Sequence, residues 1–561
     1  MLMNRRHAMM LSATTVSALI VRLGLSQDTE STQHDENLVA KNDAHVRSLM
    51  GQQNTDKASR WFGGIPRRGI YYCTSVGDLL EAGTASYLHP KSTLYHDKSL
   101  LQHLQWGVAF LERSQSPEGN IDLPATNFNS PPDTGFVVHS VGTAARLAQI
   151  HEEQELLDLY EPFLRKAGQG MAHGGVHTPN HRWVVSAALA QINEVYPDPQ
   201  YSKRIDEWLA EEIDIDEEGQ YTERSTAGYN AVTNNALVTI AHKTKRPELL
   251  DPVRKNLDAM AYLLHPNHEV VTEISLRQDL NTRSTMSKYW FSLRYLAIHD
   301  QNGLFAAMLA PLEPDGLHLP TLMEYPELSK ALPVPTAIPD NYVLPLPRSG
   351  VTRIRRGKRS TTIMHKLNTR WLTLRNGEAV INGVRFAGSF FGKGQFKPTK
   401  FKAREDGYYF SQEIRGQYYQ PITDPAHLPV PQDDVGRAKS YRATSEHCVI
   451  HYEGIVRETK EGFELTIEAH GTDDVPMAVE ISLRPGGILS GDGLQALGDD
   501  THLLKSGDAR YSVGNDVLVF GPGIAEHSDI QLRGAEGKLP GTSVYLTGFT
   551  PFKQVITINM P

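Results

Sequence analysis

Two polar segments in the first half of the chain carry residue types that can move protons. One, His177–Trp183, contains Asn180 and His181, and the other, Gly219–Asn230, contains Tyr229. Each enters a stretch of helical periodicity, so we expect both at helix N-termini, where free backbone N–H groups favour a bound anion. Taken alone, each segment also suits a structural role, because an asparagine or a serine at such a position is a common N-cap.

Together the two segments resemble the site motifs of the heparinase II/III-like polysaccharide lyases and the related alginate lyases. In that group an Asn-His pair at a helix start is followed, about fifty residues later, by a tyrosine in a motif that begins with Glu and Ser. Here the pair is Asn180-His181, and Tyr229 follows Glu223-Arg224-Ser225 at a closely similar spacing. One departure is Asn230, where the group often has histidine.

The resemblance implies an α+β multidomain chain, with an incomplete (α/α) toroid followed by an antiparallel β-sandwich. It also implies an enzyme, a polysaccharide lyase that cleaves a uronic-acid polysaccharide by β-elimination and releases 4,5-unsaturated uronates. Such a reaction needs a donor that neutralises the uronate carboxylate, a base for the C5 proton and an acid for the leaving oxygen. We assign the first role to Asn180, the acid to Tyr229, and the base to His181 or to a deprotonated Tyr229.

Other polar residues are candidates for substrate binding. Arg277 suits a bidentate contact with a carboxylate, although an ion pair with Asp279 is an equal alternative. His365 is the candidate from the β-rich half, and packing within a strand is its alternative. Tyr418 and Tyr419 suit stacking on sugar rings or ordinary sheet packing. The substrate-binding candidates are His139, Asn127, Asn129, Glu223, Arg224, Asn230, Arg277 and His365.

Two other functions remain open at this point. A glycoside hydrolase on a similar toroid needs two carboxylates across the scissile bond, which Asp133, Glu223 and Asp279 could supply. A non-catalytic carbohydrate-binding protein would keep the cleft but lose the proton-transfer groups, and both His181 and Tyr229 are present.

The chain changes character near its middle. One-sided apolar stripes at helical spacing recur over residues 100–111, 137–148, 185–196 and 253–264, which predicts a helical domain over 61–310. Residues 311–347 hold nine prolines, which predicts an extended connector. Period-two segments at 371–374, 463–467, 477–481, 517–520 and 544–547 then predict antiparallel sheets over 348–561, with turns at Asn376-Gly377, Asn382-Gly383 and Asp406-Gly407.

The N-terminus carries a twin arginine, Arg5-Arg6, before a short apolar run, which resembles a bacterial twin-arginine export signal over residues 1–27. Residues 28–60 are polar and are expected to form a linker. We therefore expect an exported, periplasmic or extracellular protein that is not inserted in a membrane. A net charge of −9 disfavours a nucleic-acid partner. A protein of this charge can bind an acidic polysaccharide only if it concentrates positive charge locally at the binding site.

The basic run at residues 353–359 is one place where positive charge is concentrated, although an exposed strand edge explains it equally well. The two cysteines, Cys73 and Cys448, could pair, but two buried thiols are the simpler expectation. No metal-ligand motif is evident, so no cofactor is expected to be required.

Overall fold

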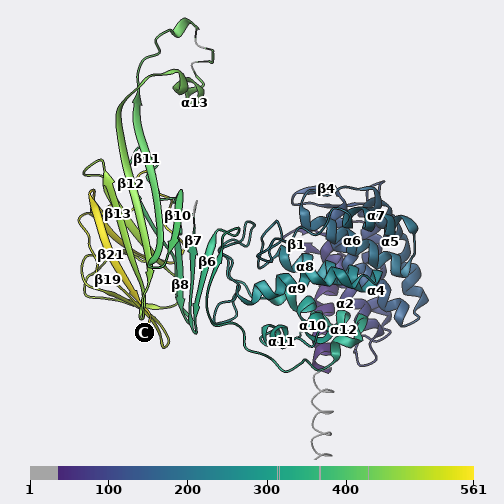
Figure 1. Cartoon of the computed structure of the whole chain (residues 1–561). Coiled ribbons are helices and arrows are strands. Elements are labelled where there is room, and N and C mark those ends of the chain that lie inside the picture. The colour runs from purple at the N-terminus through teal and green to yellow at the C-terminus, as the bar shows by residue number, and fades with distance from the viewer. Residues whose placement is uncertain (1–35, 313, 315, 366–367, 428, 432) are drawn as a thin grey trace, which may run out of the picture. The chain divides into compact units, whose positions relative to one another are not determined.

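The computed structural model describes residues 36–312, 314, 316–365, 368–427, 429–431 and 433–561 (Figure 1). The expected export signal lies outside these residues. The chain forms two compact units. The helical unit runs to Ala261 and resumes over Ser275–Ile338, and the sheet unit combines Tyr262–Ile274 with Pro339–Pro561. This division differs from the expected boundaries, because a short segment within the helical half belongs to the sheet unit.

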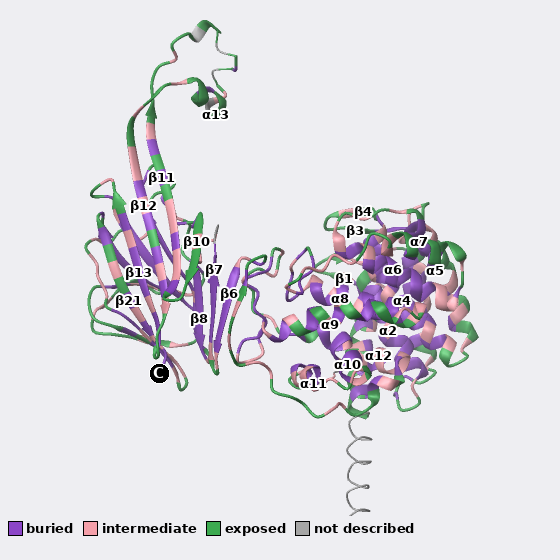
Figure 2. Cartoon of the chain, viewed as in Figure 1, coloured by how far each residue is buried: buried purple, intermediate pink, exposed green. Residues whose placement is uncertain are grey.

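The helical unit is built in two layers. Four helices contact one another in series: α2 (Cys73–Leu88), α4 (Pro131–Ile150), α6 (Pro179–Val195) and α8 (Tyr229–Thr244). Between them in sequence, α3 (Lys98–Ser114), α5 (Gln154–His173) and α7 (Pro199–Leu209) form a second row, and α9 (Leu250–Ala261) follows α8. Figure 2 shows that α2, α4 and α6 are buried on most sides, whereas α7 is largely exposed. The predicted stripes lie on α3, α4, α6 and α9, but the last one was predicted too long, because α9 ends at Ala261 and Leu264 belongs to the sheet unit.

Residues 36–52 are helical, although a linker was expected there. Leu38, Val39, Val46 and Leu49 form a buried stripe that the polar composition of the segment conceals. The segment is also fixed by Asn42, whose Nδ2 donates to Ala82 O over 2.9 Å. Tertiary burial of one narrow apolar face therefore decides its structure.

The proline-rich segment is only partly extended. Helices α10 (Trp290–His299) and α11 (Gly303–Leu309) are followed by α12 (Leu319–Glu324), which packs against α2 and α4. Pro320 lies in the first turn of α12, where the missing N–H costs no hydrogen bond. Short 3-10 turns cover Pro247–Leu249, Ser287–Tyr289, Gly316–His318 and Pro326–Ser329. Residues 330–340 have no regular structure, as expected of a connector.

The sheet unit contains two large sheets among its described residues. One has the order β16-β17-β20-β14-β9-β8-β7-β6-β5 and the other β10-β11-β12-β13-β21-β19-β18-β15, and every pair is antiparallel except β17 with β20. The predicted strands lie in β8, β13, β14, β19 and β20 and are confirmed. Pro345 lies in β5, at a sheet edge, where proline is tolerated.

The described strands fall into two large sheets and several small pieces. The first sheet comprises β5 (Asn341–Leu346), β6 (Val351–Arg356), β7 (Arg359–Met364), β8 (Leu372–Asn376), β9 (Ala379–Gly388), β14 (Pro476–Leu483), β16 (Leu494–Gly498), β17 (Thr501–Leu504) and β20 (Thr542–Phe549). The second comprises β10 (Lys400–Arg404), β11 (Gly407–Tyr419), β12 (Thr444–Glu458), β13 (Gly462–Gly471), β15 (Ile488–Ser490), β18 (Ala509–Val513), β19 (Asp516–Gly521) and β21 (Phe552–Asn559). Small pieces are β1 (Pro66–Arg67), β2 (Ile70–Tyr71), β3 (Ile121–Leu123), β4 (Asn127–Ser130), α13 (Val435–Ala438) and 3-10 turns at Pro425–His427 and Lys439–Tyr441.

The two sheets share one buried core. Trp371 packs edge-on against Phe410, with ring centroids 5.3 Å apart, and Phe386 against Tyr452 at 5.5 Å. Trp371 directly precedes β8 and Phe386 lies in β9, both of one sheet, whereas Phe410 and Tyr452 lie in β11 and β12 of the other, so these contacts join the two layers.

Three local expectations need correction or completion. Asn376-Gly377 and Asp406-Gly407 form the predicted turns, but Asn382-Gly383 lies inside β9, where the pairing shifts register. In the basic run, Arg353 and Arg355 are buried, so the run does not form an exposed positive cluster. Both cysteines are free, with Cys73 buried and Cys448 half-buried. Among the described residues, none of the helices has the length and apolar character to span a membrane.

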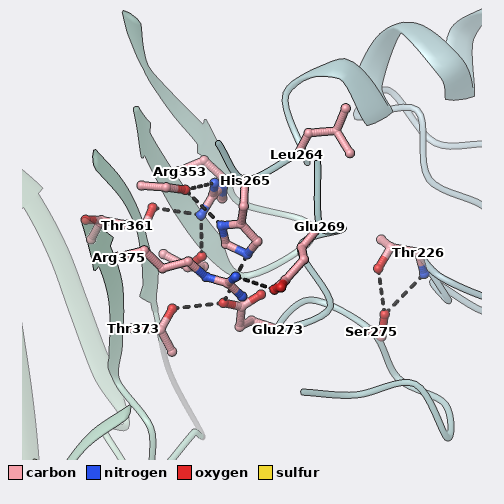
Figure 3. Close-up of polar contacts among 12 residues, drawn as sticks. Thr226, Leu264, His265, Glu269, Glu273, Ser275, Arg353, Thr361, Thr373 and Arg375 are labelled. Atoms are coloured by element: carbon pink, nitrogen blue, oxygen red, sulfur yellow. Dashed lines mark hydrogen bonds and ion pairs between the residues drawn. The ribbon is translucent and has the colours of Figure 1, made fainter. Parts of the chain in front are cut away.

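Segment Tyr262–Ile274 is held in the sheet unit by buried charges (Figure 3). Glu269 accepts from Arg375 at 2.5 Å and from Arg484 at 3.0 Å. Burial alone would raise the pKa of Glu269, but the two arginines outweigh it and hold the pKa at about 2. Glu273 accepts from Thr373 Oγ1 at 3.0 Å and lies 3.8 Å from His265 Nε2. The segment is therefore an integral part of the sheet unit.

Candidate active site

Asn180 lies in the first turn of α6, and its side chain faces Glu223. Thr178 is the N-cap residue, so Asn180 does not cap the helix. Its Nδ2 donates to Glu223 Oε1 at 2.7 Å, and its backbone N–H donates to the same oxygen at 3.2 Å. Among the described residues, Asn180 Oδ1 has no hydrogen-bond partner although it is buried. Glu223 therefore takes one of the two N–H groups of the amide and fixes its orientation, and the second N–H makes no hydrogen bond among the described residues.

His181 follows directly and is almost completely buried. Its ring lies edge-on to His177, with centroids 4.7 Å apart, and to Phe136 at 6.1 Å. Its buried Nδ1 has no hydrogen-bond partner within the described part of the chain. Burial, together with the charges of His177 and Arg277, lowers the pKa of His181 to about 4, although Asp133 opposes the shift. The imidazole is therefore neutral near pH 7 and can accept a proton.

Tyr229 and Arg277 complete this cluster. Tyr229 is the first residue of α8, and its backbone N–H donates to Ser225 Oγ at 3.0 Å. The Cζ atom of Arg277 lies 5.1 Å from the centre of the Tyr229 ring, and its Nε atom lies 3.7 Å from Glu223 Oε2. Contacts therefore run without interruption from Asn180 through Glu223 and Arg277 to Tyr229.

Asp279 braces the turn that precedes Tyr229. Its carboxylate accepts from Ser225 Oγ at 2.9 Å, from the backbone N–H of Ala227 at 3.0 Å and from Ser275 Oγ at 2.8 Å. Ser275 Oγ also accepts from the backbone N–H of Thr226 at 3.1 Å (Figure 3). Arg277 pairs with Glu223. The carboxylate of Asp279, considered above as its alternative partner, instead holds the turn before Tyr229.

The loop before α4 lies beside the cluster. Asn127 Nδ2 donates to Asp133 Oδ2 at 2.8 Å, and Asp133 is one of the charges that act on His181. Asn129 has a left-handed backbone (φ +47°), and its Oδ1 accepts from Ser116 Oγ at 2.8 Å. These contacts fix the segment that leads into α4, the helix that carries Asp133 and Phe136.

Arg224 is the strained neighbour of Glu223 in the second segment. It has a φ of +42°, and its carbonyl accepts from the backbone N–H of Leu276 at 2.8 Å. This bond joins the Glu223 turn to the loop that carries Arg277.

The side chains of three remaining candidates have the following contacts. Asn230 is fully buried, and its Nδ2 donates to Gln220 Oε1 at 3.0 Å. The Nδ1 atom of His139 lies 2.6 Å from Gln191 Oε1, farther along α4 and α6. His365 belongs to the sheet unit, where it lies 2.8 Å from Thr352 Oγ1 and stacks on Phe401.

Tyr418 and Tyr419 are exposed at the end of β11. This part of β11 pairs with β12 alone, and Figure 1 shows the two strands running on as a ribbon.

His177 is the residue of this site that the sequence reasoning passed over. It lies four residues before His181, which the sequence shows. Its effect on the pKa of His181 depends on contact between the two rings, which the sequence does not show. Among the described residues, no group of three or more His, Cys, Asp or Glu side chains is arranged to hold a metal ion.

Solved structures with the same fold include several lyases. Chondroitin AC lyase from Streptomyces coelicolor A3 superposes with a TM-score of 0.54 at 12% identity, over 94% of this chain and 79% of that one. Xanthan lyase from Paenibacillus gives 0.53 at 8% identity, over 93% of this chain and 55% of the other. The chain shares the fold of these two lyases. Heparan sulfate lyase HepC from Pedobacter heparinus superposes with a TM-score of 0.45 at 10% identity, over 93% of this chain and 83% of that one.

The resemblance first drawn from Asn180-His181 and Tyr229 is thus confirmed at the level of the fold. No protein-family model matches the sequence, and none of the curated proteins does.

Proposed function

We propose that the protein is a polysaccharide lyase that cleaves a uronic-acid polysaccharide by β-elimination and releases 4,5-unsaturated uronates. The observation that carries this proposal is the unbroken set of contacts from Asn180 through Glu223 and Arg277 to Tyr229, with a neutral His181 beside it. A donor amide, a cation, a proton acceptor and a phenol are the groups that the reaction requires.

The architecture that we propose is an incomplete (α/α) toroid followed by a β-sandwich. The two-layered row of helices supports the first, because α2, α4, α6 and α8 are neighbours in space while the helices between them lie outside. The core shared by two antiparallel sheets supports the second.

In the proposed reaction the uronate carboxylate binds the free N–H of Asn180 and the guanidinium of Arg277. Both donors stabilise the negative charge that develops when C5 loses its proton. Neutral His181 takes that proton, the electron pair forms the C4–C5 double bond, and the bond from C4 to the leaving oxygen breaks. Tyr229 gives its phenolic proton to that oxygen, which leaves as a hydroxyl group.

The deciding experiment follows ultraviolet absorbance of the conjugated uronate over a panel of acidic polysaccharides. We expect wild-type protein to produce it, and Tyr229→Phe to reduce kcat by about 100-fold or more, the usual effect of losing a general acid. Tyr95→Phe is the matched control, because Tyr95 is an exposed tyrosine of the same unit. New reducing ends without absorbance would instead indicate a hydrolase, and neither product would indicate a binding protein.

We also propose that the protein is exported, on the basis of Arg5-Arg6 and the apolar run after them. Its substrate would then be an extracellular or periplasmic polymer. Fractionation of a bacterial host that expresses the full chain tests this, with Arg5→Lys/Arg6→Lys as the comparison. Accumulation of both forms in the cytoplasm alone would contradict export.

A further inference from the structure

A central cavity of about 290 Å³ lies among the inner helices of the helical unit. Its lining comes from α2, α4, α6, α8, α10 and α12, and includes Glu81, Phe136, His139, Ser140, Phe291 and Tyr325. We call this space the central cavity. Glu81 and His139 are deep in the unit yet keep part of their surface exposed, because they face the cavity.

The central cavity begins at the candidate active site. Phe136 lines it and also contacts the His181 ring, with centroids 6.1 Å apart. Val232 lines it as well and lies about one helical turn after Tyr229 on α8. A group bound in the cavity would therefore lie next to the residues proposed to act on the uronate.

The charges around the cavity do not suit a second anion. Glu324 accepts from Lys243 at 2.7 Å and from Thr143 Oγ1 at 2.9 Å, and Lys243, whose side chain is 2% exposed, also pairs with Glu194. Glu194 also lies 3.4 Å from Arg146 Nε, so the charges beside the cavity are paired with one another. Burial raises the pKa of Glu81 to about 8, so its carboxyl group is protonated near neutral pH and can donate a hydrogen bond.

His139 adds no charge either. Burial lowers its pKa, and its Nδ1 lies 2.6 Å from Gln191 Oε1, so the ring is neutral near pH 7. Among the described residues, the cavity lining holds no lysine or arginine that could bind a carboxylate or a sulfate. Its carboxylate Glu324 is paired with Lys243, and its other polar groups are neutral donors and acceptors.

The remaining lining suits a sugar ring. Phe136, Phe291 and Tyr325 present aromatic surface, and Ser140 and Thr321 add hydroxyl groups. Small-molecule pockets typically span about 300–1,000 Å³ and combine aromatic walls with a few polar groups. At about 290 Å³ this cavity is at the small end of that range, which suits a single ring.

We propose that the central cavity binds one neutral sugar unit. This extends the proposed function and rests on it in one respect: the polymer cleaved at Tyr229 would carry a neutral sugar, at an end or on a branch, next to the reacting uronate. Polymers made of uronates alone would then be poor substrates.

Calorimetric titration of the full chain with free glucose, galactose, mannose and rhamnose tests the binding directly, with glucuronate as the anionic comparison. We expect at least one neutral sugar to bind saturably and glucuronate to bind at least tenfold more weakly. Phe291→Leu should weaken binding about five- to tenfold, since it removes one aromatic wall. Phe128→Leu is the matched control, because Phe128 is 71% exposed and does not line the cavity.

Thr321→Phe, which fills the cavity from α12, should abolish binding and serves if Phe291→Leu fails to fold. Tyr229→Phe should bind the sugar like wild type, so the result does not depend on lyase activity. The proposal is overturned if no neutral sugar binds, if glucuronate binds more tightly, or if Phe128→Leu weakens binding as much as Phe291→Leu. Sugar binding without any lyase activity would overturn the proposed function and leave the cavity assignment standing.

Discussion

The protonation of His181 should set the lower pH limit of activity. The ring must be neutral to take the C5 proton, and burial holds its pKa at about 4. Activity is therefore retained above that pH and lost as the pH falls through it, because the protonated ring cannot accept a proton.

The size of the effect follows from the titration curve. At pH 5 a group with this pKa is about 90% neutral, whereas a histidine at its ordinary value of about 6.5 would be only about 3% neutral. The difference is roughly thirtyfold in activity at pH 5. Two neighbours should shift the limit in opposite directions. His177→Asn removes a charge that lowers the pKa of His181, and Asp133→Asn removes one that raises it.

The measurement is kcat/KM from pH 3 to 8, read from ultraviolet absorbance of the product. We expect an acid limb near pH 4, moved upward in His177→Asn and downward in Asp133→Asn. Samples held at each pH and assayed again at pH 7 separate titration from unfolding. A limb near pH 6.5, or one that neither substitution moves, would refute the assignment of His181 as the base.

Three further outcomes are expected. Glu223→Gln should lower kcat/KM about 10- to 100-fold, because it weakens a charged hydrogen bond that fixes Asn180. Asp279→Asn should lower kcat more than it changes KM, because it loosens the turn before Tyr229 while both substrate donors remain. Glu269→Gln should lower the free energy of unfolding of the sheet unit by about 3 kcal/mol at pH 7, and by less than half of that at pH 3.

The sign of the last effect follows from the lowered pKa of Glu269. Its contribution is present above the unfolded value of 4.5 and is lost as the pH falls through about 2. Urea unfolding at both pH values measures it, and an equal loss at pH 7 and pH 3 would contradict the assignment. Glu248→Gln, an exposed substitution, is the control for all three variants. Activity within twofold of wild type in Glu223→Gln or Asp279→Asn would contradict their proposed roles.

Regular elements were predictable where a single periodicity spans several turns. The stripe from Leu100 to Leu111 and the alternation at Val544–Thr547 depend only on which face is apolar, and both are confirmed. Asn382-Gly383 is a strong local turn signal, yet pairing of β9 with β8 and β14 keeps it within a strand. Arg353 is buried because Thr361 O and Ser360 Oγ accept from it, and these partners cannot be deduced from composition.

The candidate site was predictable in part. Two adjacent residues, Asn180 and His181, and one tyrosine could be chosen because each precedes a helical stripe. Their relation to Arg277 and Asp279 could not, since it depends on contacts between segments about fifty to a hundred residues apart in sequence. A spacing in sequence does not specify which carboxylate accepts from which donor.

Segment Tyr262–Ile274 has a consequence for how the protein is made. It is synthesised before most of its partners, so Glu269 has no arginine to pair with until Arg375 and Arg484 have left the ribosome. Domains generally fold in order of synthesis, but here the sheet unit needs a strip of chain from inside the earlier half. A cut at the connector would therefore leave Arg375 buried without its carboxylate in the C-terminal half. Expressed separately, that half should fold poorly, and addition of the missing segment as a peptide should rescue it.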